Sequence, residues 1–193
     1  MSTRLETARL VIRTFQARDA DPSLSMVTDP EVRRFLPAGP APTIELAQRI
    51  IGERQVMERE LGHTMWAVED KTTGTFVGQC GLRPVDEGAG PEIDLAYHYI
   101  RASWNKGYAT EAAIAVIGHG LGPVGLAAIM AVVVLENIGS WRGHGEGGHA
   151  LPGARRLLRH GRPEEVPRRA GVVEIATCLM RPAGRAARPS ATY

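Results

Sequence analysis

The stretch from Glu92 to Ala113 constrains the fold most, because its pattern changes from that of a strand to that of a helix within a few residues. Apolar side chains alternate through residues 93–99, which is the period-two pattern of a strand. From Gly107 onward, small and apolar residues recur at helical spacing. The first turn of a helix carries unpaired N–H groups and the positive end of the helix dipole, so the segment predicts a strand, a tight turn and a helix start suited to phosphate.

The ten residues Trp104–Ala113, Trp-Asn-Lys-Gly-Tyr-Ala-Thr-Glu-Ala-Ala, make this turn specific. They closely resemble the acetyl-CoA loop of the GNAT superfamily of N-acetyltransferases, in the branch that includes bacterial ribosomal-protein N-terminal acetyltransferases. The family pattern (Gln or Arg)-x-x-Gly-x-(Gly or Ala) maps onto Trp104–Ala109, with Trp in place of the basic residue. The branch usually has Gly where this chain has Asn105, and Asn tolerates a positive φ better than most residues. A plain turn is the alternative, and the resemblance favours a pyrophosphate loop.

A second motif follows a long apolar run at residues 126–135. The string Glu-Asn-Ile-Gly-Ser-Trp-Arg at residues 136–142 resembles the family's Asn-x-x-Ser motif, which ends one strand and begins the last helix. In the family these side chains contact the pantetheine arm and help position the thioester, so the resemblance implies those roles for Asn137 and Ser140. With Leu-x-x-Arg and Asp-Ala near the start of the chain, the resemblance covers about residues 8–142.

The order of the predicted elements agrees with this resemblance. At 193 residues the chain fits one domain of the α/β (α+β) class. We expect a GNAT-like mixed, mostly antiparallel sheet flanked by helices. Strands are predicted at residues 9–13, 64–69, 75–82, 93–100 and 126–135, and helices begin near Ala17, Glu31, Thr43 and Gly107.

The composition changes abruptly after Arg142. Residues 1–142 contain 14 Lys and Arg against 17 Asp and Glu, whereas residues 143–193 contain 9 Arg against 4 Glu, with 8 Gly and 5 Pro. We therefore divide the chain into an incomplete GNAT acetyltransferase domain at 1–142 and an Arg/Gly/Pro-rich tail, unlike the family, at 143–193.

A shifted reading frame accounts for this break. With plausible GC-rich codons, residues 143–153 read one nucleotide later give Val-Met-Glu-Lys-Ala-Gly-Met-Arg-Tyr-Gln-Gly, which resembles the family's continuation. The hypothesis is one extra nucleotide after the Arg142 codon, and the alternative is a divergent tail. The closing C-terminal strands would then be missing or replaced, and the strand at 126–135 would gain an exposed edge. Within the tail, only residues 171–180 have the pattern of a strand.

The resemblance implies acetyl transfer from a thioester to an amine. Such a reaction must hold CoA, needs a neutral attacking nitrogen, and needs donors for the charge that grows on the carbonyl oxygen. In the family, two central strands splay apart and pantetheine pairs with the backbone exposed between them. The resemblance implies that acetyl-CoA, as cosubstrate, contacts Tyr99, Ile100, Trp104, Asn105, Lys106, Gly107, Tyr108, Ala109, Thr110, Asn137 and Ser140.

Asp94 is the first candidate for the catalytic base. An α-amine has a pKa of about 8, so at neutral pH a base assists its attack. Asp94 lies where the family often carries a strand carboxylate, and a solvated strand-edge aspartate is the alternative. Glu92 is a second catalytic candidate and Ser140 a third, through the thioester. His98 reads as a core or surface residue, and Glu111 as a structural one.

Other site classes find little support in the sequence. His144, Glu146, His149 and His160 match no metal-ligand spacing, so we expect no metal. The two cysteines suggest no disulfide framework, and Cys80 reads as a buried thiol. No apolar run reaches membrane length and no signal-peptide pattern is present, so we expect a cytoplasmic monomer or homodimer without membrane contact.

The expected function is acetyl-CoA-dependent transfer of acetyl to a primary amine, either a protein N-terminus or a small amine. Two alternatives remain. The first is a CoA-binding remnant without turnover. The second is a basic-tailed nucleic-acid-binding protein, although the Arg-rich tail lacks interleaved aromatic residues, which argues against specific nucleic-acid recognition.

Overall fold

The computed structural model describes residues 2–36, 39–84, 93–134, 154–158 and 175–180. Its strands are β1 (Arg4–Glu6), β2 (Leu10–Arg13), β3 (Met65–Asp70), β4 (Phe76–Pro84), β5 (Ile93–Tyr99), β6 (Ile129–Val134), β7 (Ala154–Leu158) and β8 (Ile175–Met180). Its helices are η1 (Ala17–Asp19), α1 (Ala20–Thr28), α2 (Pro30–Arg33), α3 (Ile44–Leu61), η2 (Arg101–Ser103) and α4 (Tyr108–Leu121). None of the helices within these ranges has the length and apolarity needed to cross a membrane.

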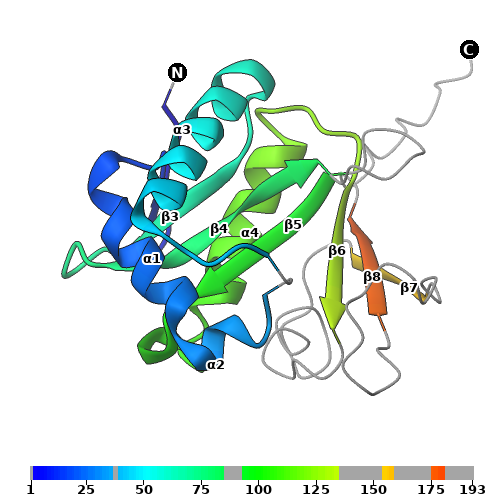
Figure 1. Ribbon diagram of the computed structural model, residues 1–193. Coiled ribbons are helices and arrows are strands. Elements are labelled where there is room, and N and C mark those ends of the chain that lie inside the picture. Colours follow the sequence, from blue (N-terminus) through cyan, green and yellow to red (C-terminus); the bar gives the residue numbers. More distant parts are fainter. Residues whose placement is uncertain (1, 37–38, 85–92, 135–153, 159–174, 181–193) are drawn as a thin grey trace, which may run out of the picture.

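The described strands form one eight-stranded sheet in the order β1-β2-β3-β4-β5-β6-β8-β7. Among these described pairs, β5 and β6 run parallel and every other neighbouring pair is antiparallel. Helices α1 and α3 lie over one face of the sheet and α4 lies over the other (Figure 1). The predicted mixed, mostly antiparallel sheet flanked by helices is confirmed.

Local signals in the sequence account for the helix boundaries. The Asp29 carboxylate accepts a hydrogen bond from the Glu31 amide at 2.8 Å, with Pro30 as the first residue of α2. Thr43 Oγ1 accepts from the Leu46 amide at 3.2 Å, and Gly62, with φ 74°, ends α3. Helix α2 ends at Arg33, and the amides of residues 35–36 bond to carbonyls three residues back and so form turns.

The main core lies between the sheet and α4. Trp66, Leu82 and Val116 are fully buried there, from two strands and the helix. Cys80 is buried in the same layer, as predicted, and burial raises the pKa of its thiol. Phe15 belongs to a second cluster that packs under α3 on the opposite face of the sheet. Both faces are therefore covered, which fixes the register of the central strands.

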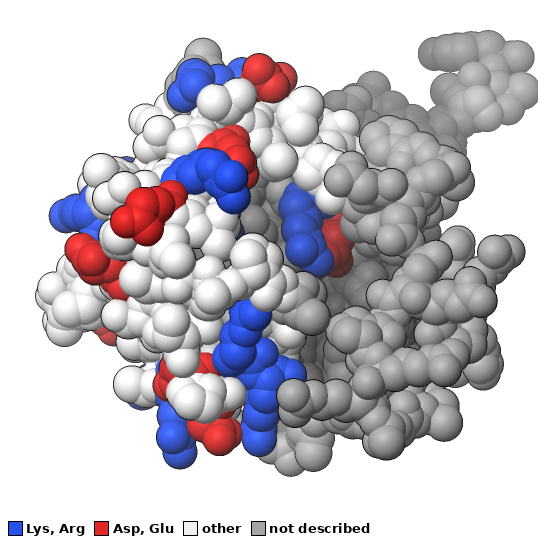
Figure 2. Space-filling model, viewed as in Figure 1, with Lys and Arg blue, Asp and Glu red and all other residues white. Residues whose placement is uncertain are grey.

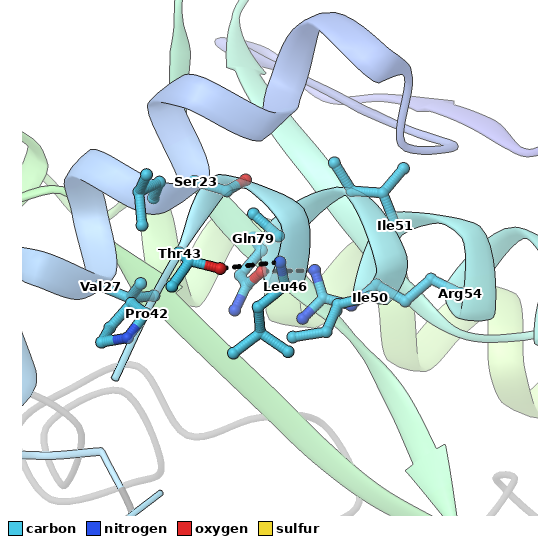
Figure 3. Close-up of a pocket in the computed structure, with 11 residues that line it drawn as sticks. Ser23, Val27, Pro42, Thr43, Leu46, Ile50, Ile51, Arg54 and Gln79 are labelled. Carbon is cyan, nitrogen blue, oxygen red and sulfur yellow. Dashed lines mark hydrogen bonds between the residues drawn. The ribbon is translucent and has the colours of Figure 1, made fainter. Parts of the chain in front are cut away.

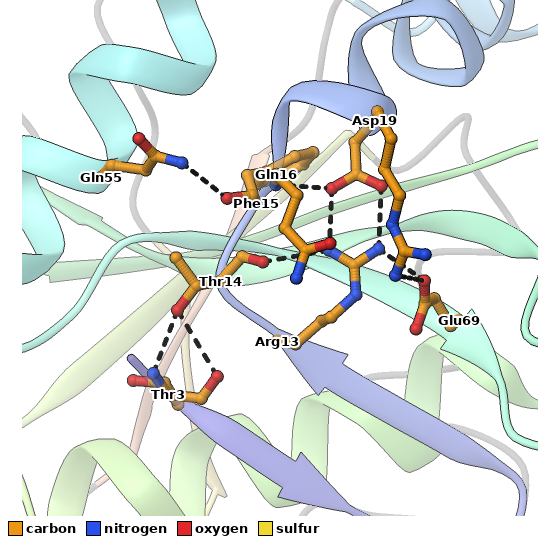
Figure 4. Close-up of polar contacts among 9 residues, drawn as sticks. Thr3, Arg13, Thr14, Phe15, Gln16, Asp19, Gln55 and Glu69 are labelled. Carbon is orange, nitrogen blue, oxygen red and sulfur yellow. Dashed lines mark hydrogen bonds and ion pairs between the residues drawn. The ribbon is translucent and has the colours of Figure 1, made fainter. Parts of the chain in front are cut away.

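An ion-pair network joins η1, which leads into α1, to the sheet (Figure 4). Arg13 of β2 donates two hydrogen bonds of 2.8 Å to the two carboxylate oxygens of Asp19. The same guanidinium donates to Glu69 of β3, which also accepts from Arg18 at 3.1 Å. Asp19 further accepts from the Gln16 amide at 2.7 Å, so one carboxylate fixes both Arg13 and the turn that begins η1 and α1.

Two predictions about the C-terminal strands are wrong. Strand β6 does not have an exposed edge, because β8 pairs antiparallel with it from Ile129↔Met180 to Val134↔Ile175. The residues of β8 were the ones predicted to be able to form a strand, and an unpaired edge is a template for such a segment. Strand β7 was not predicted, and it pairs with β8 from Ala154↔Met180 to Leu158↔Ala176.

Candidate active site

The turn between β5 and α4 has a backbone shaped for close approach. Asn105 has φ 59° and Gly107 has φ 78°, so both adopt the left-handed conformation. The tolerance of Asn105 for positive φ is thereby confirmed. Gly107 is the N-cap of α4 and offers no side-chain cap, and residues 105–107 are exposed. The amides of the first turn of α4 therefore have no capping side chain, which leaves them to an outside acceptor.

Glu111 anchors this turn to the connection between β1 and β2. Its carboxylate accepts hydrogen bonds from Thr7 Oγ1 at 2.6 Å, from the Arg9 amide at 2.8 Å and from Arg9 Nε at 2.7 Å. Burial alone would raise the pKa of Glu111, but these hydrogen bonds lower it below its ordinary value. Arg9 Nη1 also donates to the Lys106 carbonyl at 2.8 Å. The structure supports the structural role that the sequence suggested for Glu111.

Two aromatic side chains of the predicted loop, Trp104 and Tyr108, fix the turn to neighbouring elements. Trp104 Nε1 donates to the Tyr99 carbonyl at 2.9 Å, and its ring packs edge-on against Phe35 with centroids 6.2 Å apart. Tyr108 Oη donates to Asp70 at 2.8 Å, at the end of β3. These contacts hold the turn in place, so Trp104 and Tyr108 would serve a cosubstrate through the backbone rather than through their side chains.

Strands β5 and β6 separate beside this turn. In the described residues their parallel pairing is recorded at Asp94↔Met130, and Figure 1 shows the two strands diverging beyond that point. The Ile100 amide donates to the Val77 carbonyl at 3.1 Å and so faces β4, while the contact of Ile100 with CoA stays a prediction. Strand alternation directs the amide of Tyr99 the other way, toward the gap.

Asp94 lies where β5 and β6 are joined. Its side chain is 5 % exposed, and its carboxylate accepts from Nε and Nη2 of Arg83 at 3.1 Å each. Arg83 is the register partner of Asp94 on β4. Figure 2 shows a basic and an acidic group side by side in a hollow over β4 and β5. Arg83 therefore holds the Asp94 carboxylate in one place beside the point where β5 and β6 pair, which keeps Asp94 as the candidate base.

His98 lies on the same face of the sheet as Asp94 and belongs to a hydrogen-bonded chain. Arg54 Nη1 of α3 donates to Gln79 Oε1 at 2.8 Å, and Gln79 Nε2 lies 2.9 Å from His98 Nδ1. Because arginine can only donate, it orients the Gln79 amide, which then donates to Nδ1 and leaves the ring proton on Nε2. Burial, with Arg54 and Arg83 nearby, lowers the pKa of His98 to about 4, so the ring is neutral at pH 7.

Several predicted residues lie outside the described part of the chain. They are Glu92, Asn137, Ser140, His144, Glu146, His149 and His160. Within the described ranges, no cluster of three or more His, Cys, Asp or Glu residues could hold a metal. Sequence reasoning missed Arg54, Gln79 and Arg83. The alternation of β4 placed Gln79 and Arg83 on one face, but only the sheet register sets them opposite His98 and Asp94.

The comparisons with known proteins fit this geometry. A family model described as "Acetyltransferase (GNAT) domain" matches residues 9–148. The chain belongs to this family. The uncharacterized protein YkkB of Bacillus subtilis is 30% identical over 119 residues, which are 61% of this chain and 68% of that protein. The uncharacterized N-acetyltransferase p20 of Bacillus licheniformis is 29% identical over 69% of this GNAT chain and 74% of its own length.

A solved structure shows the same fold. It is that of yncA, a putative acetyltransferase from Salmonella typhimurium, solved with its cofactor acetyl-CoA. The match has a TM-score of 0.69 and 14% identity, and it covers 94% of this chain and 99% of that one. At this identity the likeness concerns the arrangement of the elements, which agrees with the confirmed sheet.

Proposed function

We propose that this GNAT protein transfers acetyl from acetyl-CoA to a primary amine. The observation that carries the proposal is the turn at residues 105–110, whose left-handed Asn105 and Gly107 lead to an uncapped helix start beside the gap between β5 and β6. The name of p20, an N-acetyltransferase, supports transfer of acetyl to a nitrogen, and the acetyl-CoA in the yncA structure supports acetyl-CoA as the donor. Bound acetyl-CoA supplies an activated thioester.

The chain's own residues divide the work of the reaction. The amides of residues 105–110 hold the pyrophosphate, with the Lys106 ammonium and the Thr110 hydroxyl as auxiliaries. The Tyr99 amide donates a hydrogen bond toward the carbonyl oxygen as its charge grows. Asp94, positioned by Arg83, takes the proton that the attacking amine must lose. Glu92 is the second candidate for a catalytic carboxylate. Asn137 and Ser140 contact the pantetheine arm and help to position the thioester.

The acceptor is a peptide N-terminus or a small amine. The Trp104–Ala113 motif favours the branch that includes ribosomal-protein N-terminal acetyltransferases, so N-terminal peptides belong in any acceptor screen. A CoA-binding remnant without turnover is the second candidate, favoured by the composition of residues 143–193.

We also propose that residues 143–193 are an out-of-frame tail on an incomplete GNAT domain at residues 1–142. The support is the family-like segment that a one-nucleotide shift restores after Arg142, together with the Arg-, Gly- and Pro-rich composition of the tail. In this proposal β7 and β8 occupy the place of the family's closing strands, although their out-of-frame sequence did not evolve to form strands there.

The test is a steady-state assay of CoA release with acetyl-CoA and a panel of amines, next to a CoA titration by calorimetry. We expect CoA binding and amine-dependent release. CoA binding without release from any amine would favour the remnant, and the absence of both would refute the proposal.

A further inference from the structure

A small cavity lies between α1, the start of α3 and β4 (Figure 3). Its volume is about 80 Å³. Aliphatic side chains from the two helices form its walls, namely Leu24, Val27, Leu46 and Ile50. A cavity of about 150 Å³ with such a lining holds benzene. About half that volume suits a branched aliphatic side chain and is too small for an aromatic one.

Polar groups also line this cavity. Arg54 and Gln79 line it and are joined by their hydrogen bond of 2.8 Å. In the described ranges Arg54 has no carboxylate within ion-pair distance, although burial lowers its pKa to about 10. The Ser23 hydroxyl also lines the cavity, is buried, and finds no hydrogen-bond partner in the part of the chain that the structure describes. A partly desolvated guanidinium without a counter-ion favours an anionic ligand group.

The cavity and the proposed reaction centre lie on the same face of the sheet, because Gln79 lines the cavity and shares that face with Asp94. Gln79 is the register partner of His98, and Arg83 is that of Asp94. The pair between them is Gly81↔Ala96, whose side chains are only a hydrogen and a methyl group. Between the Arg54 end and the Asp94 end of this face, β4 and β5 therefore carry only small side chains.

The length of this path limits the ligand. The two polar register pairs lie four residues apart, or about 13 Å along the strand. An α-amino acid carries its amine and carboxylate on one carbon and does not span that path. An extended dipeptide spans about 7 Å, and one hydrogen bond of about 3 Å at each end accounts for the remaining length.

We propose that the acceptor of this acetyltransferase is an extended amine of dipeptide length, with a carboxylate bound by Arg54 and a branched aliphatic side chain beside it in the cavity. This inference rests on the proposed function, because it places the amine at Asp94. A dipeptide with a C-terminal leucine or valine has the required groups. The Ser23 hydroxyl supplies a second polar contact at the cavity.

The test measures ligand binding by calorimetry on the full chain saturated with CoA. We expect Ala-Leu to bind roughly tenfold or more tightly than its C-terminal amide, because the amide lacks the charge that Arg54 pairs. Ala-Gly, Ala-Trp and free leucine should bind weakly. Arg54→Gln should abolish the preference for the acid over the amide, and Arg54→Lys should keep part of it. Arg49→Gln, an exposed arginine earlier on α3, is the matched control.

Equal binding of Ala-Leu and its amide by the unaltered protein would overturn the inference. Equal binding of Ala-Leu and of a longer peptide that ends in Ala-Leu would also overturn it. CoA release measured with the same panel separates the two proposals. Selective binding of Ala-Leu without any acetyl transfer would refute the proposed function and leave the cavity assignment standing. Acetyl transfer to amines with and without a carboxylate alike would support the proposed function and refute the cavity assignment.

Discussion

Replacing Asp19 by asparagine removes one charge from the network in Figure 4 while keeping the size of the side chain. The side chains of Arg13 and Asp19 are only 7 % and 3 % exposed, so water cannot replace the lost partner. Breaking a buried ion pair from one side costs about 3–5 kcal/mol, and Glu69 remains on the same guanidinium. We therefore expect a loss of about 3 kcal/mol, at the lower end of that range.

For a chain of this size, each kcal/mol shifts the Tm by about 2–4 °C, so Asp19→Asn should lower it by roughly 6–12 °C in calorimetry. Glu53→Gln is the control, because its pair with Arg49 has an N–O distance of 3.8 Å and both side chains are about two-thirds exposed. It should leave the Tm nearly unchanged. If Asp19→Asn shifts the Tm no more than the control does, the network does not stabilise the fold as argued.

Three further predictions concern pH, the base and the tail. The pKa of His98 is lowered from 6.5 to about 4, so the unfolded chain binds more protons between these pH values. The contribution of His98 to the free energy of unfolding is therefore complete above pH 6.5 and is lost as the pH falls toward 4. In urea titrations at a series of pH values, His98→Gln should lose less free energy of unfolding across this range than the unaltered chain. An equal loss in both proteins would contradict this. Asp94→Asn should lower turnover strongly at pH 7 with CoA affinity intact, and partly recover at high pH as the amine loses its own proton; an equal loss at every pH would indicate a structural role. Sequencing the encoding DNA should show that deleting one nucleotide near codon 143 opens the family-like frame, and the corrected protein should melt higher and transfer acetyl faster; DNA without that frame would end the tail hypothesis.

Local patterns were sufficient for most of the described elements. Asp29-Pro30 and Thr43 marked two helix starts through caps that depend only on neighbouring residues. The alternation along β5 placed Asp94 and His98 on one face, and Asn105 was correctly expected to accept a positive φ. These features depend on contacts within a few residues, so a single sequence contains them.

Long-range pairing was not accessible in the same way. No pattern near residue 154 indicated β7, because Ala154–Leu158 is a strand only through its pairing with β8. The chain from Arg54 through Gln79 to His98 joins a helix and two strands, and it appears only once the register is known. The resemblance implied that CoA contacts the backbone at Tyr99 and Ile100, but the register alone shows that the Ile100 amide bonds to Val77 and so faces β4.

The central claim is that the turn before α4 holds the pyrophosphate of CoA, and a calorimetric CoA titration of three proteins tests it most directly. Gly107 has φ 78°, and a Cβ there would meet Arg9 Nη2 at 3.4 Å, so Asp and Asn substitutions impose the same backbone demand and differ in charge. We expect the unaltered chain to bind CoA, Gly107→Asn to bind it more weakly, and Gly107→Asp not to bind it, because a carboxylate would repel the phosphates. Equal affinity in Gly107→Asp and the unaltered chain would contradict the account.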